Sequence, residues 1–141
     1  MSAIESLIRL YRWQLDERKR HLANLEGLAV RLREDEQRLE EENAREQALV
    51  AASPEAAYVY AGYARNLIER RRKLRQSQAE VAQQIAEARE ALAEAFQEVK
   101  RYEITAANRA RLENEREERR QQRVLDDLGA EGFRRRSDDP S

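Results

Sequence analysis

The sequence predicts an all-α protein, a long antiparallel two-helix coiled-coil hairpin with an overhanging C-terminal helix and a disordered tail. Two sets of mostly apolar positions step by alternating fours and threes, a spacing that keeps one side of an α-helix against a partner helix. A single break at residues 51–55 separates these two stripes. Because 39% of its 141 residues are charged, the chain is too polar for a globular core, and we expect one elongated domain over residues 1–128.

The first stripe predicts a helix over about residues 3–52. Three of its last five positions are polar, so this helix should weaken toward its C-terminal end. The members of the stripe are Ile4, Ile8, Tyr11, Leu15, Arg18, Leu22, Leu25, Ala29, Leu32, Glu36, Leu39, Asn43, Glu46 and Val50.

The break predicts a bend at about residues 52–57. Ser53 is a good N-cap, Pro54 suits the first helical position, and Glu55 favours the positive end of the next helix dipole. The residue before a proline is disfavoured in the α conformation, so the first helix should end near Ala52.

The second stripe predicts a helix over about residues 58–128. If the hairpin folds at residue 55, facing positions add to 110, which sets Val50 opposite Tyr60. Arg71 then lies one layer from Glu36, and we expect these two to form a partly buried ion pair that sets the register. The members of the stripe are Tyr60, Ala64, Leu67, Arg71, Leu74, Gln78, Val81, Ile85, Ala88, Leu92, Ala95, Val99, Tyr102 and Ala106.

Beyond residue 106 the first helix supplies no partner, so residues 107–128 should overhang as a single helix of about 33 Å, at about 1.5 Å per residue. Residues 113–123 contain no apolar side chain. A lone helix of this kind frays in water unless charge pairs such as Glu115 with Arg119, or a partner protein, hold it. Gly129 predicts the end of the helix, and the composition of residues 129–141 predicts a disordered tail.

The residue types argue against catalysis. The chain has one His, His21, no Cys and no glycine-rich phosphate loop, so we expect no enzymatic activity, no cofactor and no metal, and we interpret His21 as solvated. Its 27 basic and 28 acidic residues nearly balance, so the basic run at residues 70–75 is interpreted as charge pairing across the hairpin and not as a nucleic-acid site. No segment approaches the roughly 20 apolar residues of a membrane span, and no signal peptide is evident, so we expect a cytoplasmic protein.

Two regions are candidates for protein contact. Leu10 and Trp13 fall on the face opposite the first stripe, close to where the overhang begins. Near the bend, Tyr58 and Tyr63 lie off the second stripe and suit partner contact, whereas Tyr60 lies on it and should close the hairpin end. The overhang adds arginines that alternate with glutamates and suit a partner of mixed charge: Arg109, Arg111, Arg116, Arg119, Arg120 and Arg123.

Several short motifs follow one another in a defined order between residues 3 and 129. They are Leu7-Ile8-Arg9-Leu10 with Asp16-Glu17-Arg18-Lys19-Arg20, the bend Ser53-Pro54 before Tyr60-Ala61-Gly62-Tyr63-Ala64, the run Arg70-Arg71-Arg72, Ala91-Leu92-Ala93-Glu94-Ala95-Phe96, and Leu125-Asp126-Asp127-Leu128-Gly129. In this order, and with helices of unequal length, the chain resembles the FliJ family, the small coiled-coil component of the bacterial flagellar type III export apparatus.

The resemblance implies a protein that is not an enzyme and acts as a stalk. Its open end would enter the ring of the export ATPase FliI, and its shaft near the bend would contact the export gate protein FlhA. Binding of free export chaperones is also implied. The protein would lie in the cytoplasm at the inner membrane, at the flagellar base, associated peripherally and without a membrane span.

The resemblance also assigns residues to both contacts. The positions that match the gate contact are Tyr60, Tyr63 and Leu67. Two further positions of that surface fall at Arg70 and Leu74, and Arg70 departs from the small residue of some relatives. The first helix departs from the family pattern there, with Arg38, Glu42, Arg45 and Leu49. Candidates for the ATPase ring are the open-end residues Leu10, Trp13, Arg109, Arg116, Arg119, Arg120 and Arg123.

Three other functions remain open at this point. The equivalent stalk of a virulence-type secretion system has nearly the same physics. A structural scaffold would self-associate through residues 107–128. A regulator would bind nucleic acid through residues 70–75.

Overall fold

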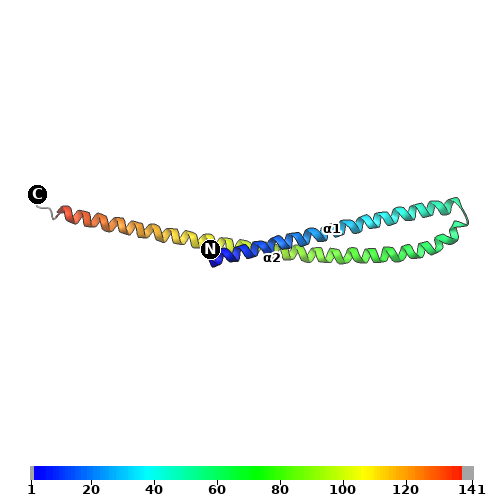
Figure 1. Cartoon of the computed structure of the whole chain (residues 1–141), viewed down its shortest axis with the longest axis horizontal. Helices are drawn as coiled ribbons and strands as arrows, with labels where there is room; N and C mark the ends of the chain where they lie inside the picture. The colour runs from blue at the N-terminus through cyan, green and yellow to red at the C-terminus, as the bar shows by residue number, and fades with distance from the viewer. Residues whose placement is uncertain (1, 138–141) are drawn as a thin grey trace. The chain divides into compact units, whose positions relative to one another are not determined.

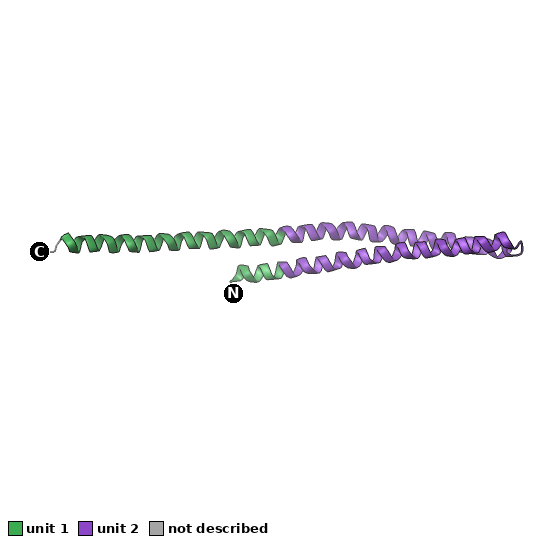
Figure 2. Ribbon diagram, turned by 90° about the horizontal axis from the view of Figure 1, so that it is seen from above, with its two compact units in different colours: residues 1–11, 98–141 green, residues 12–97 purple. Residues whose placement is uncertain are grey.

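The computed structural model describes residues 2–137 and contains two α-helices. Helix α1 spans Ala3–Ala52 and helix α2 spans Ala56–Ser137 (Figure 1). The two helices pack against each other, and no strand occurs among the residues that the structure describes, so the predicted all-α helical hairpin is confirmed. Contacts divide the chain into two units: unit 2 is Arg12–Gln97, and unit 1 is Met1–Tyr11 with Glu98–Ser141 (Figure 2).

Helix α1 begins at a reciprocal cap. The Glu5 backbone N–H donates to Ser2 Oγ, and the Ser2 backbone N–H donates to Glu5 Oε2, both at 3.2 Å. This capping box satisfies N–H groups that the first helical turn would otherwise leave open. The Ser-x-x-Glu spacing at residues 2–5 is the sequence signal for this helix start.

The bend occupies residues 53–55. Helix α1 ends at Ala52, the residue at which proline was expected to end it. The Ala56 N–H donates to the Ser53 carbonyl at 3.2 Å and the Ala57 N–H to the Pro54 carbonyl at 3.3 Å, so a tight turn leads into α2. Because Ala56 and Ala57 already make these turn hydrogen bonds, α2 begins at Ala56, two residues earlier than predicted.

The stripes form the interface between the helices. Every buried residue in the described part of the chain belongs to one of them: Ile8, Leu15, Leu25, Leu39, Asn43, Leu67, Val81, Ala88 and Val99. The other stripe positions are half-buried, except Arg18, which is exposed. A long cationic side chain on a two-stranded coil reaches water easily, so Arg18 leaves the interface.

The expected ion pair between Arg71 and Glu36 is wrong. Arg71 instead binds Glu40 with two hydrogen bonds, and Gln78 Nε2 donates to Glu36 at 2.6 Å. The guanidinium reaches a carboxylate on the edge of α1, where both charges keep part of their hydration, and so avoids the desolvation cost of a pair at the interface. The hydrogen bond raises the pKa of Arg71 and lowers that of Glu40.

The predicted helix end at Gly129 is also wrong, because α2 continues to Ser137. Gly129 keeps a helical backbone without positive φ, and an isolated glycine costs a helix only about 1 kcal/mol. Arg134, Arg135 and Arg136 lie in the last turn, where cations are favoured by the negative end of the helix dipole. The predicted tail is therefore helical over residues 129–137, and its residues 138–141 lie outside the described part of the chain.

Unit 1 contains the start of α1 and the C-terminal part of α2. The rings of Tyr11 and Tyr102 stack with centroids 4.7 Å apart, and a hydrogen bond with Tyr102 raises the pKa of Tyr11. Residues 107–137, which we call the arm, are all exposed except the half-buried Glu115 and Gly132. The arm is thus a helix without a facing helix in unit 1, about 46 Å long at about 1.5 Å per residue.

Candidate protein-interaction surfaces

The residues assigned to gate contact differ widely in accessibility. Leu67 is a core residue with only 4% of its surface exposed, and Tyr60, Tyr63 and Leu74 are half-buried. Only Arg70 is exposed. The structure therefore places much of this set inside the hairpin of unit 2, because Tyr60, Leu67 and Leu74 are stripe positions that face α1.

Tyr60 closes a small polar cluster between the helices. Its hydroxyl donates to Asn43 Oδ1 and accepts from Gln47 Nε2, each at 3.1 Å. Asn43 is the only buried polar residue among those described, and this bond supplies the partner that a buried amide requires. The prediction that Tyr60 holds the hairpin end together agrees with these contacts.

Tyr63 packs beside this cluster. Its ring lies 5.9 Å from that of Tyr60, and its hydroxyl is buried without a hydrogen-bond partner. Burial raises the pKa of Tyr63, and the negative charge of Glu42 adds to the effect. Tyr63 is therefore half-buried, and its hydroxyl is not available to a partner protein.

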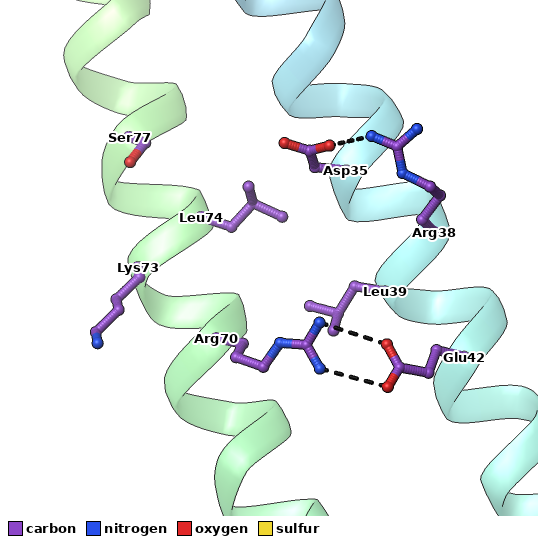
Figure 3. Close-up of a pocket in the computed structure, with 8 residues that line it drawn as sticks. All are labelled: Asp35, Arg38, Leu39, Glu42, Arg70, Lys73, Leu74 and Ser77. Carbon is purple, nitrogen blue, oxygen red and sulfur yellow. Dashed lines mark hydrogen bonds and ion pairs between the residues drawn. The ribbon is translucent and has the colours of Figure 1, made fainter.

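Arg70 and Leu74 line a groove of about 550 Å³ between α1 and α2 in unit 2. Leu39 and Leu74 form its floor, and Figure 3 shows Arg70 reaching across from α2 to the carboxylate of Glu42 at 3.4 and 3.5 Å. The rest of the rim is charged or polar: Asp35, Arg38, Lys73 and Ser77. Arg38 and Glu42, two of the four first-helix positions that depart from the pattern of the resemblance, lie on the α1 side of this groove.

The basic run is largely engaged with acidic residues. Arg70 and Arg71 pair across the hairpin with Glu42 and Glu40, and Arg72 pairs with Glu69 in its own helix at 2.7 Å. The interpretation as charge pairing across the hairpin is confirmed for Arg70 and Arg71. Phosphate binding at this run would have to compete with these carboxylates.

Several exposed apolar side chains near the bend lie off the two stripes. Tyr58 is 92% exposed, in line with its expected position off the stripe. Val59, Ile68 and Leu49 are also exposed. Their positions off the two stripes were visible in the sequence, but no contact was assigned to Val59 or Ile68.

The residues assigned to the ATPase ring are accessible. Leu10 of unit 1 and Trp13 of unit 2 are 47% and 58% exposed. The five arginines at positions 109, 116, 119, 120 and 123 all lie on the arm and are exposed. Exposed aromatic and arginine side chains are the types most enriched at the centres of protein interfaces.

Ion pairs within the arm support its helix. Glu115 pairs at 3.5 Å with Arg111, one turn before it, and not with the expected Arg119, one turn after it. Glu117 pairs with Arg120 at 3.2 Å. Both pairs are exposed, and each contributes a few tenths of a kcal/mol at most. The arm therefore depends on weak local contacts for its helical structure.

An exposed apolar cluster on the arm had no role assigned from the sequence. It consists of Val124, Leu125, Leu128 and Phe133, which are 56–71% exposed. The signal was present in the sequence as four large apolar residues within ten positions, past the end of the second stripe. The predicted helix end at Gly129 hid it, because Phe133 was placed in a tail.

No three carboxylate or imidazole groups in residues 2–137 lie close enough together to hold a metal ion. His21 is exposed, as expected. Neither helix, over its described length, is both long and apolar enough to cross a membrane.

No family model, no curated protein and no solved structure matches this chain. A functional proposal therefore depends on the geometry of the two helices, on the accessible side chains, and on the ordered motifs in the sequence.

Proposed function

We propose that this chain is a non-enzymatic stalk of the bacterial flagellar type III export apparatus. In this role the arm enters the ring of the export ATPase FliI, and the hairpin near the bend contacts the gate protein FlhA. Free export chaperones are further partners. The protein acts in the cytoplasm, at the inner membrane beneath the flagellum.

The arm is the observation that carries this proposal. Thirty-one residues, 107–137, form a helix that is exposed on nearly all sides. A scaffold that only needed two paired helices would have no use for it, and ordering it costs conformational entropy that its weak ion pairs hardly offset. A protein partner that surrounds the arm, such as a ring, provides the missing contacts.

The charge pattern of the arm suits such a partner. Arginines at positions 109, 116, 119, 120 and 123 are interspersed with glutamates at positions 113, 115, 117 and 118. A ring lined by both signs of charge would meet this surface with opposite charges at many angles around the helix. A phosphate backbone would be repelled by the glutamates.

Contact with the gate would use the groove and the exposed residues near the bend. It would not use all five residues that the resemblance assigns to it. Leu67 and Tyr60 contribute by holding the hairpin together, since both face α1. The side chains accessible to FlhA are Arg70, the half-buried Leu74 in the groove, and Tyr58.

A binding experiment with the cognate export ATPase tests the proposal. Truncation after Ala106 should abolish capture of the ATPase, while circular dichroism shows that the hairpin remains folded. Tyr58→Ala is the matched control, because it changes an exposed aromatic residue near the bend and should leave ATPase capture intact. Equal capture by the truncated and intact chains would falsify the stalk role of the arm.

The choice of ATPase distinguishes the flagellar from the virulence-type stalk. The flagellar role requires capture of the flagellar ATPase in preference to that of an injectisome. The opposite preference would move the same mechanism to the related machine.

A further inference from the structure

We propose that one side of the hairpin in unit 2 binds an acidic amphipathic helix of a partner protein. The site consists of two adjoining grooves between α1 and α2, which we call the basic groove because Lys19, Arg33 and Arg89 line it. The proposal does not rest on the stalk function, since no residue of the basic groove is among those assigned to the ATPase or the gate.

The floor of the basic groove is apolar. Its first part, of about 390 Å³, has the apolar lining residues Leu15, Leu92, Ala93 and Phe96. Its second part, of about 480 Å³, has the apolar lining residues Ala29, Val30 and Ile85. Arg89 lines both parts, so they adjoin. Phe96 is 51% and Val30 is 42% exposed, which leaves apolar surface that a partner can bury.

The two flanks of α2 beside its buried stripe differ in character. The flank on the side of the basic groove consists of exposed residues that step by threes and fours, and all but one are apolar: Ala79, Ala82, Ala86, Arg89, Ala93 and Phe96. The other flank, at the same spacing, is mostly acidic or polar: Glu80, Gln84, Glu87, Ala91, Glu94 and Glu98. A helix that packs against one neighbour needs only one apolar stripe, so the groove side provides apolar surface for a second neighbour.

Unpaired basic residues border the basic groove on α1. Glu26 pairs across the groove with Arg89 at 3.8 Å. Lys19 and Arg33 lie seven residues before and after Glu26, on the same edge of α1, because seven residues make about two turns. The α2 positions opposite them, seven residues either side of Arg89, are apolar. Neither Lys19 nor Arg33 has an ion pair with any residue that the structure describes.

The shape of the basic groove favours a helix as its occupant. Along α1 the groove extends from Leu15 to Arg33, about 27 Å at about 1.5 Å per residue. A third helix of this length can lie along both α1 and α2 and insert an apolar stripe between them, as in a three-stranded coil.

The charges favour an acidic helix. Lys19 and Arg33 lie about 21 Å apart along α1, and carboxylates on the flanks of the partner helix would pair with both. A nucleic acid would meet the two cations with its phosphates but would leave the apolar floor uncovered. An amphipathic helix with flanking carboxylates satisfies the floor and the edge together.

Two synthetic peptides test the chemistry of the partner. Each is about three heptads long and has leucine at the a and d positions, and its flanking positions are glutamate in one peptide and lysine in the other. Fluorescence anisotropy measures their binding to the full chain. The glutamate peptide should bind at least about tenfold more tightly than the lysine peptide. Equal affinities, or no binding of the glutamate peptide, overturn the proposal.

Removal of an aromatic side chain tests where the glutamate peptide binds. Phe96→Ala should raise its dissociation constant about tenfold, because the largest apolar side chain of the groove is lost. Trp13→Ala is the matched control, since Trp13 is similarly exposed, at 58%, and does not line the groove. Circular dichroism should show both variants as helical as the wild type. Equal affinities of the two variants would place the peptide elsewhere and overturn the proposal.

Reversal of a charge tests the basic edge. Arg33→Glu should raise the dissociation constant of the glutamate peptide several-fold at low salt, and the effect should shrink at high salt. Arg31→Glu is the matched control, because Arg31 is exposed and lies about 200° around α1 from Arg33. An equal loss from both reversals would mean that only net charge attracts the peptide, which contradicts a defined site.

Sedimentation of the full chain without peptide tests whether a second copy occupies the groove instead. The chain should stay monomeric at concentrations that saturate the glutamate peptide, and Phe96→Ala should not change its mass. A wild-type dimer that Phe96→Ala dissociates would make a second copy the occupant and would overturn the proposal.

Discussion

The hairpin of unit 2 and the arm of unit 1 both consist of highly charged helix. Different forces stabilise them. In unit 2, residues of both stripes bury apolar side chains between two helices, and the long arginines pair at the edges. In the arm no stripe faces a partner, and exposed ion pairs within the helix provide the support. One continuous helix can thus have a part that is stabilised by burial against a second helix and a part that is weakly stabilised and available to a partner.

The largest difference should appear on truncating a leucine in each region. Leu67→Ala removes a core side chain of unit 2 and should lower the free energy of unfolding by about 2–3 kcal/mol, the lower part of the range for leucine because a two-stranded interface can partly collapse. Leu125→Ala on the arm should change it by less than about 0.5 kcal/mol. Urea titration followed by circular dichroism compares them, and equal losses would end the distinction.

The polar cluster at Tyr60 should give a smaller effect. Tyr60→Phe removes the hydroxyl bonded to Asn43 and Gln47 and leaves the buried Asn43 amide without that partner, so the free energy of unfolding should fall by about 1–2 kcal/mol. Tyr58→Phe removes a hydroxyl from a solvated side chain and should change nothing. If Tyr60→Phe is as stable as Tyr58→Phe, the cluster does not contribute to the interface.

Two glycine substitutions test whether the arm unfolds apart from the hairpin. Gly27 in α1 and Gly129 in the arm are both helical, with open space around the missing Cβ. Gly27→Ala should raise the free energy of global unfolding by about 0.5–1 kcal/mol, because alanine loses less backbone entropy on folding. Gly129→Ala should instead slow amide hydrogen exchange within the arm alone, and a matching rise in global stability would mean that arm and hairpin unfold together.

The smallest effect concerns pH. The Arg71 hydrogen bonds lower the pKa of Glu40 below its ordinary value of 4.5. The ionised carboxylate of Glu40 is therefore more stable in the folded state than in the unfolded state. The stabilisation is therefore present above about pH 4.5 and is lost as pH falls through the lowered pKa. Because the pair is solvent-exposed, Glu40→Gln should flatten the acid limb of the stability curve only slightly, and an unchanged limb would show that solvent screens the pair completely.

The candidate surfaces were less predictable than the fold. The exposure of Trp13, Tyr58 and the arm arginines followed from their positions off the stripes or past the last facing residue. The inward positions of Tyr60, Leu67 and Leu74 also followed from the stripes, but the assignment by resemblance placed them on a contact surface. A motif records which residue types occur in order, and the packing of the two helices determines which of them remain accessible.

The sequence by itself determined the two helices, the end of α1 at Ala52 and the buried positions, because periodic burial and proline geometry act within a few residues of the chain. Only the tertiary structure decided that Arg71 binds Glu40 instead of Glu36, and that Tyr63 buries its hydroxyl. Long side chains have several carboxylates or gaps within reach, and the choice depends on where a second helix lies. Residue type likewise did not decide whether α2 continues past Gly129. The free-energy cost of one glycine in a helix is about equal to the stabilisation from a few weak ion pairs and a favourable last turn.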